Sequence, residues 1–353
     1  MDRESLSGAL HGDVCQVALT GRSRRRPGSM QEREEGRVVR VVERTRGLVA
    51  GLLVRTKYYW YVIPDTPRIT TNIHVRECAP TLQLREHHKA VVRLDDWQGP
   101  GAAASGVLVE DLGPAEAAGV EMLSLLRNHQ LDARFHDDVS DEARRRSPAL
   151  DAGDLQGRED FRSSLVITID PEDARDFDDA VSLARSPDGG WTVGVHIADV
   201  AHFVPPGGVV DREAYRRGNS VYLVGSFVPM LPPYLTSDIC SLRPGVDRLT
   251  HSVILTLDDQ ARVRASRTTP SVIHSKARLD YDQVQGYFDS QAGDHLAADV
   301  RALLDELRRV TTLLRRRRMA SGSIDLTMPE VKCVLDEAGH PVELKRRGAP
   351  EAY

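Results

Sequence analysis

The sequence predicts an α+β protein in which a small β-barrel domain precedes a mixed α/β domain. Short runs of β-branched and aromatic residues crowd residues 37–113 between turn residues, which is typical of a compact all-β domain. After residue 160, similar runs are followed by a long stretch of helical periodicity. The chain has 353 residues, enough for two or three domains. Hydrophobic residues make up 41% and charged residues 28%, proportions that exclude a globally disordered protein.

The charge is unevenly distributed along the chain. Residues 1–60 contain 12 Lys and Arg against 7 Asp and Glu, whereas residues 151–200 contain 4 against 12. Because the net charge is −5, any nucleic-acid binding must depend on local basic patches. The four cysteines form no CxxC pair, and no apolar stretch reaches the length of a membrane span or resembles a secretion signal. We expect a cytoplasmic monomer without a membrane partner.

Residues 1–36 contain one short apolar piece, residues 14–19, followed by a polar stretch broken by Gly and Pro that indicates a linker. Its arginines could attract nucleic-acid phosphates or simply remain solvated: Arg22, Arg24, Arg25 and Arg26. Residues 37–113 contain the runs RVVRVVE, GLVAGLLV, YYWYVIP, ITTNIHV, KAVVRLDDW and GVLVEDL. Five or six strands in so short a segment predict a small closed barrel, of which the OB-fold is the commonest nucleic-acid-binding example.

The barrel region carries a concentration of aromatic residues in KYYWY, residues 57–61. Alternate residues of a strand face opposite ways, so one pair of rings could fill the barrel while the other meets nucleic-acid bases. We predict Tyr59 and Tyr61 as nucleic-acid contacts, with packing inside the barrel as the alternative.

Residues 114–160 are predicted to form a helical connector, because their apolar residues begin at helical spacing and give way to polar sequence with Gly and Pro. The second domain, residues 161–353, opens with an apolar strand at residues 165–169. Further strands are expected at residues 191–197, 220–224 and 252–257. A stripe of apolar side chains then predicts a long amphipathic helix: Leu296, Val300, Leu303, Leu304, Leu307, Val310 and Leu314. The arginines at residues 315–318 suit the negative end of its dipole, and Gly322 marks its stop.

The most informative segment is VITIDPEDARDFDDAVSL, residues 166–183. An apolar strand ends at Asp170, and Asp176, Asp178 and Asp179 follow within nine positions. Carboxylates held together repel one another unless water or cations compensate. Oxygen ligands without nearby His or Cys favour Mg²⁺ or Mn²⁺, ions that commonly hold phosphates. The alternative is a solvated acidic loop. An EF-hand is excluded because the run from Asp176 has Ala180 at its fifth position and lacks the central Gly and terminal Glu.

Four ordered blocks carry a family resemblance: IDPEDARDFDDAVSL, GVHIADVAHFVPPG, SVYLVGSFVPMLPPYLTSDICSLRPGVDRLTHSV and IHSKARLDYDQV. Over most of residues 160–345 the chain resembles the RNB catalytic domain of the ribonuclease II/ribonuclease R family. The region 37–113 resembles the second cold-shock (OB) domain that precedes it there. The resemblance implies processive 3′→5′ hydrolysis of single-stranded RNA to nucleoside 5′-monophosphates, with magnesium in the site.

The resemblance also implies roles for individual residues. Asp170, Asp176, Asp178 and Asp179 match the four catalytic aspartates of the family. Asp170 and Asp179 would hold the metal that grips the scissile phosphate, with Asp176 in the same cluster, and Asp178 would be the residue most needed for turnover. Tyr222 matches an aromatic that stacks on bases near the RNA 3′ end. We interpret His196 and His202 as structural, with RNA contact as the alternative.

The chain departs from the family pattern in three places. Only the last strand of a first cold-shock domain is recognisable, in ALHGDVCQVAL. Leu326 stands where several members have a phenylalanine that clamps the terminal base. The sequence ends at GAPEAY, where the family continues, so we expect a chain truncated at both ends with an incomplete RNB domain.

Three functions remain open from the sequence. The first is a Mg²⁺-dependent exoribonuclease, with activity impaired by truncation. The second is a non-catalytic fragment that binds single-stranded RNA. The third is a metal-dependent phosphatase or glycosyltransferase that uses the acidic loop.

Overall fold

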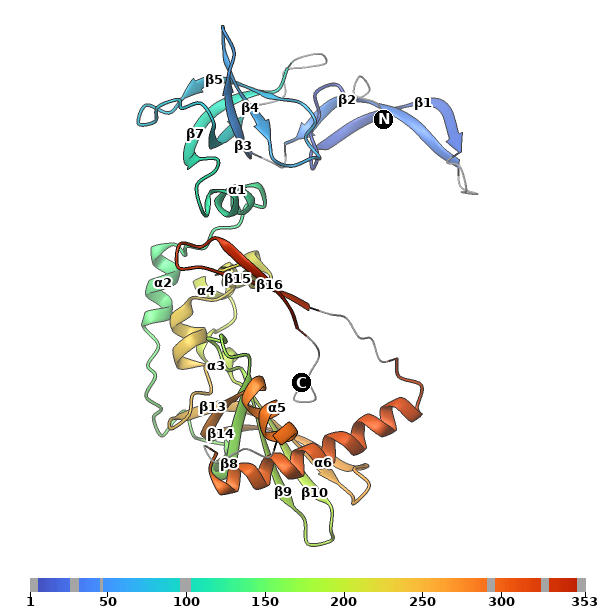
Figure 1. Ribbon diagram of the computed structural model, residues 1–353, viewed down its shortest axis with the longest axis vertical. Coiled ribbons are helices and arrows are strands. Elements are labelled where there is room, and N and C mark those ends of the chain that lie inside the picture. Colours follow the sequence, from blue (N-terminus) through green and yellow to red (C-terminus); the bar gives the residue numbers. More distant parts are fainter. Residues whose placement is uncertain are drawn as a thin grey trace. The chain divides into compact units, whose positions relative to one another are not determined.

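The computed structural model shows two compact units (Figure 1). One unit comprises Met1–Asp132 with Leu335–Val342, and the other comprises Ala133–Val334 with Glu343–Tyr353. The structure describes residues 6–25, 32–44, 47–95, 103–290, 296–324 and 330–347.

The first unit begins with a two-stranded antiparallel sheet of β1 (Val14–Arg25) and β2 (Glu32–Glu43). Much of the predicted linker within residues 1–36 is therefore strand. The run RVVRVVE pairs with β1, with Val38 opposite Val17, and is not part of the barrel that follows. The expected start of the barrel at residue 37 is corrected to Leu48, because the β-branched pattern identifies a strand but not its partner.

The next five strands close into a barrel in the order β3-β4-β5-β7-β6, which confirms the predicted OB-like domain (Figure 1). The strands are β3 (Leu48–Arg55), β4 (Trp60–Pro64), β5 (Ile73–Cys78), β6 (His88–Leu94) and β7 (Ser105–Pro114). The barrel is filled by residues that are at most 4% exposed, among them Val49, Leu53, Val62, Ile73, Val92 and Leu108. Helix α1 (Val120–Asn128) is fixed to β3 because the Asn128 amide bonds both the N–H and the C=O of Ala50, at 3.0 and 3.3 Å.

A second closed barrel, which the sequence did not predict, forms the centre of the other unit. Its order is β10-β13-β14-β8-β9. The strands are β8 (Glu159–Asp170), β9 (Asp179–Arg185), β10 (Trp191–Ala198), β13 (Asp247–Leu257) and β14 (Val263–Asp280). Strands β8 and β14 run parallel, with Asp170 opposite Asp280, so their carboxyl ends lie at the same edge of the barrel.

Short elements precede the first strand of this barrel and connect β10 to β13. They are α2 (Asp137–Arg144), α3 (Val200–Phe203), α4 (Val209–Arg217), β11 (Val221–Leu223), β12 (Ser226–Val228) and a π-helix, η1 (Leu235–Ile239). The hairpin of β11 and β12 places Tyr222 directly opposite Phe227. Near the C-terminus, β15 (Glu330–Leu335) and β16 (Pro341–Arg347) form a separate two-stranded sheet.

Two helices, α5 (Tyr281–Ser290) and α6 (Ala298–Ala320), cover one side of the barrel (Figure 1). The predicted apolar stripe of α6 packs against the barrel: Leu303 and Leu304 join a core with Ile167, and Val310 joins one with Trp191. The helix ends at Ala320, and Gly322 has a φ of 90°, a conformation that favours glycine. The predicted amphipathic helix and its stop are confirmed.

The interior of the second barrel contains a hydrogen-bonded network of polar side chains. His196 is fully buried, with Nδ1 at 2.6 Å from the Ser252 hydroxyl and Nε2 at 2.9 Å from the Ser182 hydroxyl. Burial lowers the pKa of His196 to about 4, so the ring is neutral at pH 7. The interpretation of His196 as structural is confirmed, and His202 bonds Asp154 at 3.0 Å.

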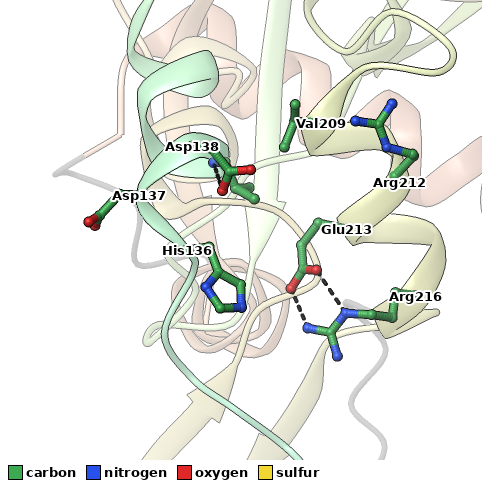
Figure 2. Close-up of a pocket in the computed structure, with 8 residues that line it drawn as sticks. His136, Asp137, Asp138, Val209, Arg212, Glu213 and Arg216 are labelled. Carbon is green, nitrogen blue, oxygen red and sulfur yellow. Dashed lines mark hydrogen bonds and ion pairs between the residues drawn. The ribbon is translucent and has the colours of Figure 1, made fainter.

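Helix α4 borders a cleft of about 510 Å³ that also involves α2 (Figure 2). Glu213 lies in the wall of this cleft and is only 8% exposed. Its carboxylate accepts hydrogen bonds from Arg216 and from Arg217, the latter at 2.7 Å. The cleft shares no lining residue with the predicted site, and its buried acid is already paired, so it does not serve as the candidate site.

The pairing of Glu213 predicts a pH-dependent contribution to stability. Hydrogen bonds and charges from Arg216 and Arg217 lower the pKa of Glu213 from 4.5 to about 2. The folded state therefore gains stability above about pH 4.5 and loses it as the pH falls towards 2. We expect Glu213→Gln to lower the free energy of unfolding by ~1–3 kcal/mol at pH 7. Urea unfolding should show this difference shrinking in acid, whereas the exposed control Glu116→Gln should change little. An equal difference at pH 7 and pH 3 would contradict this account.

Candidate active site

The candidate site is built on the loop between β8 and β9. The apolar residues that end β8 are buried, with Val166 and Ile167 fully inaccessible, and this anchors the strand in the barrel. Asp170 is the last residue of β8 and Asp179 is the first residue of β9, so both are fixed by the ends of paired strands. Asp176 and Asp178 lie in the connecting segment of residues 171–178, named here the aspartate loop.

The aspartate loop is held at Phe177 by the segment that follows η1. The Phe177 N–H donates to the Ser241 hydroxyl at 3.2 Å, and the Leu242 N–H donates to the Phe177 carbonyl at 2.7 Å. The next carbonyl, that of Asp178, accepts from the Ala198 N–H at 2.9 Å. The Phe177 ring is partly buried and packs against the core. The backbone on both sides of Asp178 is thus fixed without using its side chain.

Arg278 holds the other end of the aspartate loop. This residue lies on β14, beside β8, and its Nη2 donates to the carbonyls of Pro171 at 3.0 Å and Glu172 at 2.8 Å. Its guanidinium lies 5.3 Å from the centre of the Phe177 ring, and its charge acts on Asp170. A role for Arg278 could not be predicted from the sequence, because its contacts depend on the parallel pairing of two strands that are far apart in the chain.

The pKa values show that three of the aspartates are electrostatic neighbours. Asp170 is 6% exposed, and burial together with the charges of Asp179 and Asp178 raises its pKa to about 6, against the opposing effects of Thr168 and of the charge of Arg278. Burial and the neighbouring Asp178 also raise the pKa of Asp179. Such mutual repulsion is the condition that a bound cation relieves.

Tyr222 lies beside the remaining part of the aspartate loop. Burial and the charges of Asp176 and Asp178 raise the pKa of its hydroxyl, so both carboxylates act electrostatically on this side chain. Its side chain is nevertheless 70% exposed, which leaves a surface available for stacking. The structure therefore brings all four predicted aspartates and Tyr222 into one neighbourhood.

The donor set is chemically suited to magnesium. The Oδ2 atom of Asp170 is buried and has no hydrogen-bond partner in the described part of the chain, which is costly unless another ligand approaches it. Among the same described residues, no group of three or more His, Cys, Asp or Glu side chains is arranged so that it could hold a metal ion. Asp178 and Asp179 are exposed, so their side chains can turn towards Asp170 without disturbing the core. The oxygen donors and the unpartnered atom fit a hard cation.

Asp280 is a further buried carboxylate at this edge of the barrel. It faces Asp170 across the β8–β14 pair and is 7% exposed. Its Oδ1 accepts from the Gln283 N–H at 2.7 Å, and its own N–H donates to the Gln283 side chain at 3.1 Å. This reciprocal arrangement caps α5. Asp280 therefore has a structural explanation, and we do not assign it to the site.

The aromatic residues of the first barrel divide between its core and its outside, and the prediction that Tyr59 and Tyr61 contact RNA stays a prediction. Tyr59 is 49% exposed, with its ring centre 6.1 Å from that of Tyr61 and 5.1 Å from that of His74. Trp60 instead packs against the barrel core. The alternation along β4 thus turns the tryptophan inward and leaves Tyr59 and Tyr61 together outside the core.

Some sequence predictions fall on residues that the structure leaves undescribed. Leu326 and the last six residues lie outside the described ranges, and so do the side chains of Arg22, Arg24, Arg25 and Arg26. The arginines at residues 315–318 lie near the end of α6, where Arg317 donates to the Ala261 carbonyl at 2.8 Å. Among the described residues, no helix is both long and apolar enough to cross a membrane.

Comparisons with known proteins identify two domains. The RNB domain model matches residues 158–352, and a cold-shock domain model matches residues 61–136. Ribonuclease R of Thermotoga maritima is 35% identical over 99% of this chain and 49% of its own length. The chain thus spans about half the length of this curated relative.

Solved structures show the same fold. Mycoplasma genitalium RNase R, in complex with ribose-methylated single-stranded RNA, matches with a TM-score of 0.88 at 24% identity, over 99% of this chain and 54% of its own. Yeast Ssd1, described as a pseudonuclease, matches with a TM-score of 0.65 at 21% identity, over 83% of this chain and 37% of its own. Since the RNB model covers more than half of the residues and the ordered motifs fall within it, the chain belongs to the RNB-domain family that includes ribonuclease R.

Proposed function

We propose that the chain carries the catalytic site of a 3′→5′ exoribonuclease that hydrolyses single-stranded RNA to nucleoside 5′-monophosphates with Mg²⁺, or with Mn²⁺ in its place. The observation that carries the proposal is the aspartate loop, fixed through Phe177 and Arg278 and placed beside an exposed tyrosine. The likeness to ribonuclease R over the whole chain supports this choice of substrate and direction. The cytoplasmic location and the monomeric state stay predictions.

In this proposal, Asp170 and Asp179 hold the metal, with Asp176 in the same cluster. When bound, magnesium supplies positive charge against the phosphodiester that water attacks. Asp178 orients the attacking water, because its carboxylate is exposed while its backbone is fixed. Tyr222 stacks on a base, a contact that tolerates any sequence and so suits progressive degradation. The reaction requires no covalent intermediate with the protein.

The first barrel would contribute RNA affinity. Tyr59 and Tyr61 lie near Arg55 and Lys57, which face the rings of Trp60 and Tyr58 at 5.6 and 5.5 Å. Stacking on an aromatic side chain is worth ~1–3 kcal/mol per base, so we expect Tyr59→Ala to weaken binding of single-stranded RNA about fivefold or more. Fluorescence anisotropy at fixed salt measures this effect. Tyr215, 90% exposed on α4, provides the matched control, and an equal loss in Tyr215→Ala would count against a stacking surface at Tyr59.

An assay with 5′-labelled single-stranded RNA and Mg²⁺ tests the proposed reaction. Progressive shortening to a limit product is expected, with release of nucleoside 5′-monophosphates and no cleavage of a circular RNA that lacks a 3′ end. Cleavage of the circle would contradict the exonuclease assignment.

The alternative is a non-catalytic module that binds single-stranded RNA. This alternative is kept because Ssd1 has the same fold and is described as a pseudonuclease. Retention of the labelled RNA without shortening, at concentrations where binding is saturated, would support this alternative.

A further inference from the structure

Tyr222 stacks against a second ring, that of Phe227. The two residues are cross-strand partners in the β11–β12 hairpin, with ring centres 6.0 Å apart and planes inclined by only 15°. Phe227 is half-buried, whereas Tyr222 is exposed. The phenylalanine thus supports the tyrosine from the protein side, and aromatic pairs of this kind hold each other's orientation.

A contact links this ring pair to the aspartate loop. The guanidinium of Arg175, in the aspartate loop next to Asp176, lies 6.0 Å from the centre of the Phe227 ring. This is within the range of cation–π attraction. Arg175, Phe227 and Tyr222 therefore form a chain of contacts from the aspartate loop to the exposed ring.

We propose that Phe227 is a positioning residue that orients Tyr222, and that Arg175 couples this ring pair to the aspartate loop. As a result, an unpaired base stacked on Tyr222 places its phosphate over the aspartates. This inference rests on the proposed function and extends it to two residues outside the set of four aspartates and Tyr222. The positioning role of these two residues is distinct from metal binding, because neither the Phe227 nor the Arg175 side chain has an oxygen atom that could bind a metal.

The physical reason for a supporting ring is the freedom of an exposed side chain. A tyrosine that is 70% exposed can rotate about χ1 and would lose that freedom whenever a base stacks on it. A ring already held by Phe227 avoids part of this cost on binding. The same constraint fixes the distance between the base and the aspartates, on which the rate of hydrolysis depends.

The test uses single-stranded RNA with 2-aminopurine either at the 3′ end or in the middle of the strand. Binding is followed in EDTA by quenching of the terminal base, and single-turnover shortening is followed with Mg²⁺. We expect Phe227→Leu to weaken terminal quenching and slow shortening by about two- to tenfold, the range of an aromatic pair. Phe227→Tyr keeps the stack and should resemble the wild type, which separates loss of the ring from loss of folding.

Double variants test whether the contacts act through one another. Phe227→Leu should have no further effect in a Tyr222→Ala background, and an abasic 3′ nucleotide should erase the difference between Phe227→Leu and the wild type. Arg175→Gln should slow shortening more than it weakens terminal quenching. If the two residues were independent, Arg175→Gln would slow RNA shortening by the same factor in both backgrounds. We expect this factor to be smaller in the Phe227→Leu background.

Two results would overturn the inference while leaving the proposed function intact. One is a Phe227→Leu chain that quenches and shortens RNA like the wild type. The other is a Phe227→Leu chain whose rate of shortening falls as much with the abasic RNA as with the normal RNA, which would indicate a merely structural defect. A wild-type chain that neither quenches the terminal base nor shortens RNA would overturn the proposed function and the inference together.

Discussion

Asp178→Asn should abolish the shortening of RNA while leaving the affinity for single-stranded RNA nearly unchanged. The Asp178 side chain is exposed beside Asp170 and Asp179, and its own carbonyl is fixed by Ala198, so an amide of the same shape leaves the aspartate loop in place. The substitution removes one negative charge from the aspartate cluster. Loss of a group that stabilises charge in the transition state costs ~10²-fold or more in rate. Single-turnover kinetics and anisotropy, measured on the same preparations, test both parts.

A matched control for Asp178 lies in the same loop. Asp173 carries the same charge, but its exposed carboxylate pairs on the surface with Lys332 at 3.0 Å. We expect Asp173→Asn to keep the rate of shortening within a few-fold of the wild type. If both variants lose activity equally, the general charge of the loop, and not Asp178, is responsible. A parallel fall in RNA affinity for Asp178→Asn would argue that this residue binds RNA instead of promoting hydrolysis.

Arg278→Met should produce the second large effect, by releasing one end of the aspartate loop. Its charged hydrogen bonds to the Pro171 and Glu172 carbonyls would be lost, and Asp170 would lose a compensating positive charge. Hydrogen bonds to charged groups contribute ~1.5–3 kcal/mol, so the variant should be measurably less stable in urea unfolding. Because a misplaced carboxylate costs on the order of 10²-fold in rate, shortening should slow by about that factor and require more Mg²⁺.

Conservative replacement and a control on the same strand separate positioning from folding. Arg278→Lys retains the charge but cannot reproduce the planar fork that reaches two carbonyls, so partial recovery of the rate is expected. Arg267, also on β14, pairs on the surface with Glu159, and Arg267→Met should leave the rate of shortening and its Mg²⁺ requirement unchanged. Wild-type rates and Mg²⁺ requirement in Arg278→Met would contradict a role for this residue in holding the loop.

The parts of the structure that were predicted correctly depend on local sequence. The runs between residues 48 and 114 identify strands by β-branched residues and turns, and the apolar stripe of α6 follows helical spacing. The four aspartates fall within ten consecutive residues after a buried strand, so the backbone alone brings them together. Both the OB-like barrel and the acidic cluster could therefore be predicted without knowing the tertiary pairing.

The parts that were missed depend on partners distant in sequence. The strand at residues 37–43 was recognised, but its pairing with β1 instead of the barrel could not be inferred from its own residues. Closure of the second barrel requires the parallel alignment of β8 and β14, and Arg278 reaches the aspartate loop only through that alignment. The role of Phe227 could not be predicted from the sequence, because a single aromatic residue in a short strand ordinarily packs in the core. Only the hairpin register places it beside Tyr222.

Titration with Mn²⁺ followed by electron paramagnetic resonance tests, without RNA or turnover, whether the four aspartates Asp170, Asp176, Asp178 and Asp179 bind divalent cations. We expect saturable Mn²⁺ binding that Mg²⁺ displaces, that Asp173→Asn retains, and that replacing Asp170, Asp178 and Asp179 together by asparagine removes. Undiminished Mn²⁺ binding in that triple variant, or no binding by the wild type, would contradict this expectation.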